Sequence, residues 1–340
     1  LAGDPRPAGA GYDIGAFELQ AETPFTPTAT VFLPLITATA TPSTPPTAAG
    51  HITYRLGDRL YRVAAQEGAT PEDVSAALDA LAAGTDDEWL NVSPDGAWLL
   101  VSTERFDAGC AGWACLTLVK HDFSAYEVVR ADGMLLHPAF SAVASGGALI
   151  VYPEEGGPHA QDLWAVRCSG TAWSAPVLLT GDSPHAYNAQ PALTSDGSKV
   201  VFDCGPVPYG QEGTVICEVN TDGSDFRVAA QASDIGGSVQ DALHHPDYAP
   251  DGSIVFESDW GGEKIWRIPA GTTTPQVITT NFTNDNSPCV LPDGRVASLW
   301  LNRPGADGGH EIKVMAADGS SYIMALAGVD VLDIGIGCGE

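Results

Sequence analysis

The sequence is poor in basic residues. Its 340 residues include 15 Lys and Arg against 43 Asp and Glu, which gives a formal net charge of −28. Nucleic acids and anionic membranes are bound by basic protein faces, so this balance argues against both kinds of partner. Apolar runs are short, and none approaches the ~18 residues of a membrane-spanning helix. The chain begins at Leu1 rather than Met, as we expect of a processed product or of a fragment of a longer protein.

The sequence signatures of several common enzyme classes are missing as well. We find no G-x-S-x-G nucleophile elbow, no phosphate-binding P-loop and no dinucleotide fingerprint. The acidic residues Asp95, Asp196, Asp251 and Asp293 stand in short turns. An Asp in such a turn caps its own backbone, and we assign these residues that role. The sequence therefore favours a protein without catalytic activity.

What is abundant is a repeated strand–turn–strand pattern. It reads NVSPDGAWLLVST at 91–103 and recurs at 191–203, 247–258 and 287–299, with a degenerate copy at 138–152. Asp-Gly between two apolar runs is a strong hairpin signal, because Gly adopts the positive φ that the turn needs. A hairpin recurring every ~40–55 residues indicates a four-stranded propeller blade.

The ends of the repeat region complete one another. Residues 51–67 match only the second and third strands of a repeat, and 331–338 match an inner strand that has no partner. This predicts an all-β, six-bladed propeller over residues 51–340, closed by one blade shared between the two ends. On its flank, residues 70–84 predict a helix with Thr70 as N-cap. The complete repeats lie at about 87–129, 136–180, 187–230, 244–280 and 283–326.

The repeated pattern resembles the TolB-type propeller repeat, which is related to the WD-type blade. The residues that carry the resemblance are the turns Pro94-Asp95-Gly96, Asp196-Gly197, Pro250-Asp251-Gly252 and Pro292-Asp293-Gly294. The resemblance implies a propeller but not a function, because such propellers occur in periplasmic binding modules, peptidase lids, polysaccharide lyases and cell-surface proteins. Separately, GYDIGAFE at 11–18 resembles the end of secreted right-handed β-helix domains.

Residues 1–50 form an extended tail, rich in Thr and Pro, ahead of the propeller. Pro and Thr at this density favour extended conformations and build no core. The tail is interrupted by the apolar stretch VFLPLI, which is costly to expose to solvent. We expect this stretch to dock on a protein surface as an extended peptide, most notably on another copy of the chain. The contact residues would be Val31, Phe32, Leu33, Leu35 and Ile36.

The seven cysteines indicate disulfides. Cys110 and Cys115 flank a short loop, and Cys204 and Cys217 fall on successive strands of one repeat. Neither pair has the doubled C-x-x-C spacing of a zinc site, so we expect both pairs to be disulfides. Disulfides are typical of secreted proteins, here an extracellular or cell-surface protein of a bacterium. The pairing of the other three stays open, with at least one thiol left over: Cys168, Cys289 and Cys338.

One set of residues could hold a divalent metal ion. Aligning the repeats places His137, Gln190 and His245 at the same point, each followed by Pro. In a propeller these points ring one mouth of the central channel, and two imidazoles and an amide can bind a metal, with His244, His185 or Asp285 nearby. Some propeller-fold pectate-degrading lyases use His and Gln metal sets on such a face. The alternative is that these side chains merely solvate the mouth, which leaves the protein without a cofactor.

Two functions follow from these observations. The first is a non-catalytic extracellular propeller that mediates protein–protein contacts, as a self-assembling cell-surface or filament subunit linked through its tail. The alternative is a glycan-binding or polysaccharide-lyase-like propeller with a metal at the channel mouth. Fold alone does not choose between them.

Overall fold

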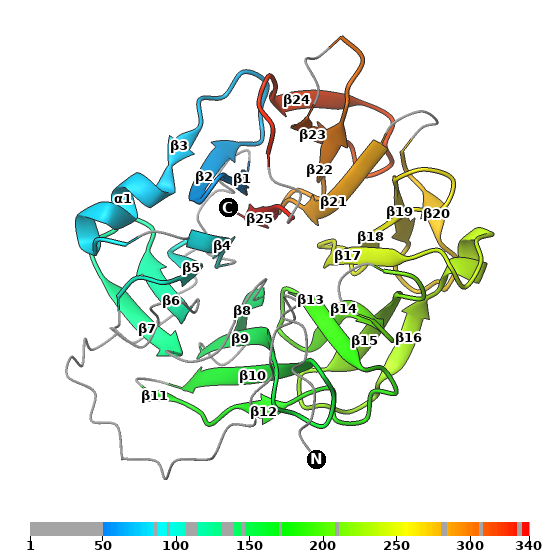
Figure 1. Ribbon diagram of the computed structural model, residues 1–340, viewed down its shortest axis with the longest axis horizontal. Helices are drawn as coiled ribbons and strands as arrows, with labels where there is room; N and C mark the ends of the chain where they lie inside the picture. The colour runs from blue at the N-terminus through cyan, green and yellow to red at the C-terminus, as the bar shows by residue number, and fades with distance from the viewer. Residues whose placement is uncertain are drawn as a thin grey trace, which may run out of the picture. The chain divides into compact units, whose positions relative to one another are not determined.

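A computed structural model describes residues 50–339 apart from ten short gaps, which are 85–86, 94–95, 107–114, 131–138, 144–146, 170–171, 208–210, 280–283, 306–308 and 332–334. For residues 139–143 and 169 only the backbone is described. The tail with its VFLPLI stretch, and the GYDIGAFE string, lie outside the described residues. The described residues form six antiparallel sheets arranged around a channel (Figure 1). The predicted six-bladed β-propeller is confirmed.

Each blade runs from an inner strand at the channel to an outer strand at the rim (Figure 1). The inner strands of five blades are β4 (Asp87–Val92), β8 (Ala139–Val143), β13 (Tyr187–Leu193), β17 (Leu243–Tyr248) and β21 (Asn284–Val290). The second strands are β5 (Trp98–Thr103), β9 (Gly147–Glu154), β14 (Lys199–Gly205), β18 (Ile254–Ser258) and β22 (Val296–Leu301). The third strands are β6 (Cys115–Lys120), β10 (Asp162–Ser169), β15 (Val215–Asn220), β19 (Lys264–Ile268) and β23 (His310–Met315). The outer strands are β7 (Tyr126–Arg130), β11 (Ala172–Trp173) with β12 (Val177–Leu178), β16 (Arg227–Ala230), β20 (Gln276–Val277) and β24 (Tyr322–Leu326).

The hairpins between the first two strands share one turn geometry. In each described case the Gly N–H donates a 2.8 Å bond to the carbonyl three residues earlier. These glycines have φ between 66° and 85°, a region that residues with a Cβ avoid. The turn Asp side chains at 196, 251 and 293 each accept a 3.0 Å bond from the N–H two residues on, which supports the capping role assigned to them. The glycines are Gly96, Gly197, Gly252 and Gly294.

The sixth blade joins the two ends of the ring. Strand β25 (Gly337–Gly339) pairs with β1 (His51–Leu56), which continues into β2 (Arg59–Ala64) and β3 (Glu72–Asp73). The pairing sets His51 opposite Gly339, so the predicted closure by a shared blade is confirmed. A disulfide from Cys338 to Cys289 of β21 then fastens the closing strand to the neighbouring blade. This resolves the pairing that the sequence left open for these two cysteines.

The helix on the flank is shorter than predicted. Helix α1 covers Val74–Leu81 and begins after Asp73, not after Thr70. The reason is that Glu72 and Asp73 are paired with β2 as strand β3, so the chain turns helical only beyond them. The Asp73 side chain then caps the helix by accepting a 2.9 Å bond from the N–H of Ala76.

The core lies between the blades rather than in the channel. Apolar side chains form six clusters, one at each junction of adjacent blades. The second strands supply much of this core, and β5 is buried along all six of its residues. A charged pair also lies inside: Asp87 is fully buried and accepts hydrogen bonds from Nε and Nη2 of Arg105, at 2.7 and 3.0 Å. Because the apolar side chains pack between the faces of adjacent blades, the inner strands are free to line the channel.

Candidate functional site

A cavity of about 310 Å3 opens into the channel between the inner strands. Its described lining comes from residues on or next to β4, β13, β17, β21 and β25, each in a different blade. The wall is largely apolar and carries few polar side chains, a composition typical of ligand sites. Five prolines contribute to the wall, and they are Pro191, Pro246, Pro250, Pro288 and Pro292.

Three inner strands share a strained bulge at the point that the repeat alignment singled out. Gln190, His245 and Ser287 have φ of 48°, 50° and 47°, in the left-handed region, and each precedes a proline. The ladder between the first two strands skips at the same place in β13, β17 and β21. A left-handed non-glycine residue costs roughly 1–2 kcal/mol, and bulges re-aim side chains next to functional sites. The equivalence of Gln190 and His245 is therefore confirmed, whereas His137 lies outside the described residues.

His245 is the centre of a hydrogen-bonded network. Its Nδ1 lies 3.1 Å from Oε2 of Glu257 on β18, and its Nε2 lies 3.0 Å from the amide nitrogen of Gln190. Because a carboxylate only accepts, Nδ1 carries the proton, and Nε2 accepts a hydrogen bond from Gln190. The backbone N–H of His245 also donates to Oε1 of Gln190 at 3.3 Å. Two of the three sequence-predicted metal ligands are thus neighbours.

Glu257 is the member of this network that the sequence analysis missed. Its side chain is 4% exposed, and it accepts a 2.6 Å bond from the backbone N–H of Ser287 in the next blade. Burial raises the pKa of Glu257, but the imidazoles of His244 and His245 and the bonds it accepts outweigh burial and hold that pKa below its usual range. The carboxylate is therefore ionised among two imidazoles.

Two further acidic residues lie close by, and burial is the largest influence on the pKa of each. Asp203 occupies in β14 the place that Glu257 occupies in β18, and burial raises its pKa well above the ordinary value. Asp247 lines the cavity and accepts bonds from the N–H groups of Val290 at 2.7 Å and Tyr248 at 2.8 Å. Burial raises the pKa of Asp247 to about 6 against the effect of these bonds.

Tyr248 links the cavity wall to an ionic cluster behind it. Its hydroxyl donates a 2.9 Å bond to Oε2 of Glu218, which also binds Lys199 at 2.7 Å and Arg227 at 2.9 Å. Burial raises the pKa of Glu218, but the bonds from Arg227, Lys199 and Tyr248 lower it further than burial raises it. This cluster ties the second, third and outer strands of the third blade to the inner strand of the fourth.

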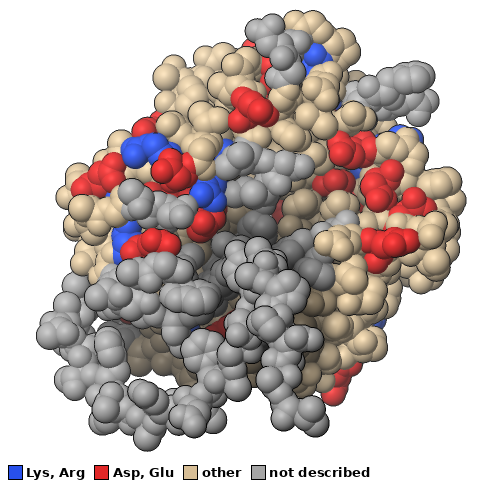
Figure 2. Space-filling model, in the orientation of Figure 1, with Lys and Arg blue, Asp and Glu red and all other residues tan. Residues whose placement is uncertain are grey.

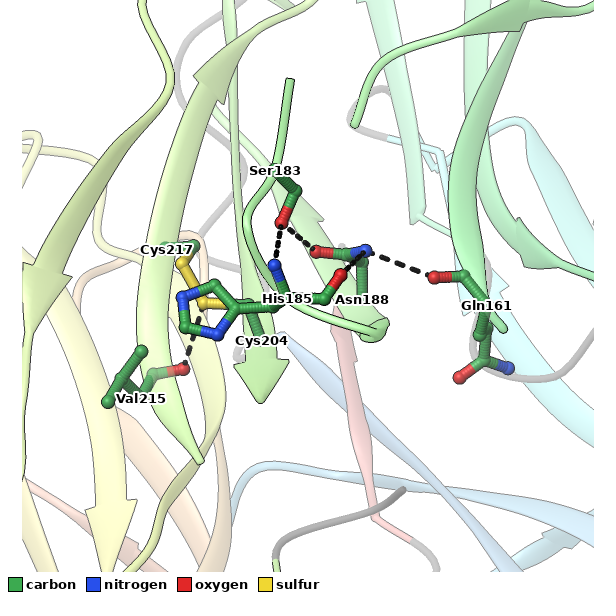
Figure 3. Close-up of a disulfide and its surroundings, with 7 residues drawn as sticks. All are labelled: Gln161, Ser183, His185, Asn188, Cys204, Val215 and Cys217. Atoms are coloured by element: carbon green, nitrogen blue, oxygen red, sulfur yellow. Dashed lines mark hydrogen bonds between the residues drawn. A yellow bond between two sulfur atoms is a disulfide. The ribbon is translucent and has the colours of Figure 1, made fainter. Parts of the chain in front are cut away.

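The other histidine considered near the channel belongs to a disulfide. Cys204 and Cys217 are bonded to each other, as predicted, and the ring of His185 lies beside them (Figure 3). Ser183 accepts a 3.2 Å bond from the N–H of His185 and donates a 2.8 Å bond to Asn188, which fixes this turn. Because sulfurs joined in a disulfide do not act as thiolate ligands, this group is a structural staple.

Of the remaining residues singled out from the sequence, some are described by the structure and others are not. Asp285, which the sequence placed near the mouth, is buried in an ion pair with Lys313. Cys168, whose pairing the sequence left open, is buried. Cys110, and with it the predicted bridge to Cys115, lies outside the described residues. The tail residues from Val31 to Ile36 lie outside them too, so their contact role stays a prediction.

A signal for Glu257 was present in the sequence. The second strands of the third and fourth blades read VVFDC and IVFES, with an acid directly after the same Phe. A carboxylate at a buried strand position needs a partner, which points to the adjacent inner strand. That strand carries His244 and His245, and register sets His244 opposite Glu257.

Known proteins resemble this chain in its fold. No family model and no curated protein matches the sequence. Among solved structures, the putative TolB of Agrobacterium tumefaciens aligns with a TM-score of 0.54 at 18% identity, covering 82% of this chain and 88% of that one. The chain folds as a TolB-type propeller. At this identity the likeness extends to the fold alone.

Other solved structures with a similar fold are longer chains. Kuenenia stuttgartiensis hydrazine synthase aligns with a TM-score of 0.57 at 15% identity, covering 84% of this chain and 44% of that one. A puromycin-hydrolyzing peptidase of Mycobacterium tuberculosis aligns with a TM-score of 0.50 at 14% identity, covering 82% and 45%. This chain therefore spans less than half of each of these two proteins.

Proposed function

We propose that this TolB-type propeller is a non-catalytic, extracellular protein that mediates protein–protein contacts, with the tail of one copy bound by another copy. In this form it is a self-assembling cell-surface or filament subunit. Two disulfides among the described cysteines support an oxidising compartment. Among the described residues no helix is both long and apolar enough to cross a membrane.

The observation that carries this proposal is the cavity at the edge of which the tail is attached. A Cβ built on Gly50 would lie 2.7 Å from the carbonyl oxygen of Gly339 and 3.0 Å from side-chain atoms of Leu291 and Pro292. All three of these neighbours line the cavity. From Gly50 to Ile36 the sequence runs 14 residues, which reach about 43 Å in polyproline conformation, far enough to leave the propeller.

The cavity wall suits an extended apolar segment as its occupant. Its five prolines, with Leu193, Val290 and Leu291, offer flat apolar surface, and Trp89 and Tyr248 add aromatic surface. Proline-rich segments pay little conformational entropy on binding, because they are already extended. A Leu-Pro-Leu segment supplied by a second copy matches this wall in chemistry.

The glycan alternative finds less support. None of the described residues that line the cavity is Lys or Arg, the side chains that bind the carboxylates of acidic glycans. Acidic side chains also gather on the face seen in Figure 2, over the blade formed by β17 to β20. The cavity therefore offers an anionic chain no cation among its described lining, and the acidic side chains repel it.

The test uses the full chain with a matched control. Leu33→Asp combined with Leu35→Asp places two charges in the apolar stretch, whereas Thr28→Asp combined with Thr30→Asp adds the same charges outside it. Light scattering over a range of protein concentrations should show assemblies for the native chain and the Thr variant, and monomers for the Leu variant and for a chain lacking residues 1–48. If the Leu variant and the truncated chain kept the size of the native protein, the proposal would be wrong.

A further inference from the structure

Three potential metal ligands converge where the third, fourth and fifth blades meet. The ligand atoms of His244, His245 and Glu257 all lie within 4.8 Å of one another. Nε2 of His244 is 3.8 Å from Oε1 of Glu257, and Nδ1 of His245 is 3.1 Å from Oε2. We propose that these three residues bind one divalent transition-metal ion. The proposal is independent of the tail contact, because it involves none of the tail residues.

The spacing of these ligand atoms suits a bound metal ion. Around a tetrahedral ion with bonds of about 2.0–2.1 Å, neighbouring ligand atoms stand roughly 3.3 Å apart. The two measured nitrogen–oxygen distances bracket this value, so small rotations of the three side chains would complete the site. Two imidazoles and one carboxylate favour ions such as Zn2+ or Co2+ over Ca2+ and Mg2+, which prefer oxygen ligands.

The fold holds these ligands in place. His245 stands at the strained bulge with φ of 50°, which turns it out of the regular strand geometry. The N–H of Ser287 binds Oε2 of Glu257 at 2.6 Å and fixes the carboxylate from the neighbouring blade. Outer contacts of this kind orient the ligands of metal sites.

The site can be reached from the channel. The imidazole of His245 lines the cavity and is 19% exposed, and that of His244 is 16% exposed, whereas Glu257 closes the inner side at 4%. Three protein ligands leave a tetrahedral ion one open position. That position would be filled by water or by an electron-pair donor from whatever occupies the cavity.

Gln190 gives the proposal a distinctive consequence. Binding of the ion to Nδ1 of His245 moves the ring proton from Nδ1 to Nε2, so that Nε2 becomes a donor. The nearest group, 3.0 Å away, is the amide nitrogen of Gln190, which would then have to turn its oxygen toward the ring. Gln190→Glu supplies an oxygen there directly, and should strengthen metal binding by about 10-fold, as carboxylate partners of ligating imidazoles do.

The experiment measures Co2+ and Zn2+ binding to the full chain with its disulfides intact. Equilibrium dialysis with elemental analysis should give one ion per native chain, and Co2+ should develop the visible absorption of a tetrahedral site. Glu257→Gln keeps an oxygen for Ser287, and His244→Asn is close in shape; each should weaken binding by more than the ~10–100-fold typical of outer contacts. His185→Asn, beside the disulfide, is the matched control and should bind as the native chain does.

Several results would overturn the proposal. These are a native chain that binds no stoichiometric ion, equal affinity for the native chain and both ligand variants, loss of binding in His185→Asn, or weaker binding in Gln190→Glu. Far-UV circular dichroism of each metal-free variant separates loss of a ligand from loss of the fold. The gain expected for Gln190→Glu cannot come from misfolding, so it tests the site even if a ligand variant unfolds.

Discussion

Removing the Cys289–Cys338 disulfide should open the ring before it affects any single blade. The bridge joins β21 to β25, a strand of only three residues that pairs with β1 through His51, Ile52 and Thr53. Besides this ladder, the closing strand is held by the apolar cluster around Ile52 and Ile336, by the covalent bridge and by packing of Gly337 and Gly339 against β4. A Cys289→Ala, Cys338→Ala double variant keeps the apolar character and removes the cross-link.

The size of the effect follows from the loop that the disulfide closes. The two cysteines are 49 residues apart, for which loop-closure entropy in the unfolded chain corresponds to about 4 kcal/mol. The Cys204–Cys217 bridge spans 13 residues and corresponds to about 3 kcal/mol. For a propeller of this length the entropy of unfolding converts these values to losses in Tm of roughly 7 °C and 5 °C.

The assay is thermal unfolding of the native chain, of the Cys289/Cys338 variant and of a Cys204→Ala, Cys217→Ala variant, with hydrogen exchange on each. The ring-closing variant should melt lowest, and β25 and β1 should lose their protection first. The Cys204/Cys217 variant should lose stability without early exchange in β25. The reasoning is refuted if the ring-closing variant melts within a degree of the native chain, or if β25 keeps the protection of the blade cores.

Two further predictions concern buried charges. Arg105→Met should destabilise the fold by about 3–5 kcal/mol in urea unfolding, because it leaves Asp87 buried without its cation, and adding Asp87→Asn should recover part of the loss. Glu218→Gln should cost about 2 kcal/mol at pH 7, because it weakens the charge-assisted bonds from Lys199 and Arg227. The pKa of Glu218 is held below its unfolded value of ~4.3, so its stabilisation is present above that pH and is lost as pH falls through the folded pKa. The stability gap between native chain and Glu218→Gln should therefore close below about pH 4, and a gap that stays constant from pH 7 to pH 3 would contradict the assignment.

The fold could be predicted from the sequence because each propeller blade corresponds to a local sequence repeat. Each Asp-Gly turn specifies its own hairpin, and the spacing of the hairpins specifies the blades. Closure could be predicted too, because the unpaired strand at the C-terminal end supplied the inner strand that residues 51–67 lacked. The start of α1 could not be predicted from the sequence. Thr70 and Pro71 favour a helix start locally, but Glu72 and Asp73 pair with β2, so the helix begins only after Asp73.

Only some residues of the candidate site could be predicted from the sequence. Repeat alignment found Gln190 and His245 because equivalent positions share a place on the ring. It could not find Glu257, which contributes from the second strand, because contacts between strands and between blades are absent from a linear alignment. The Cys289–Cys338 bridge was left open likewise, since the two residues meet only once the ring has closed.

Comparison of the three bulges separates what the fold needs from what the site adds. All three described X-Pro bulges have the same left-handed φ, so the backbone feature belongs to the repeat. The residue opposite the position before the bulge differs: it is Asp203 in the third blade, Glu257 in the fourth and Leu299 in the fifth. Because the fifth blade forms its bulge with Leu299 in that place, an acid there is not required for the blade's own backbone.

The pairing of an ionised Glu257 with two adjacent histidines is found in the fourth blade and in neither of the other two. A buried charge costs free energy unless it is paired, and the partner of Glu257 here is His245, which lines the cavity. That combination is expected where a blade has been adapted to bind a ligand, and it is the physical reason for placing the metal there.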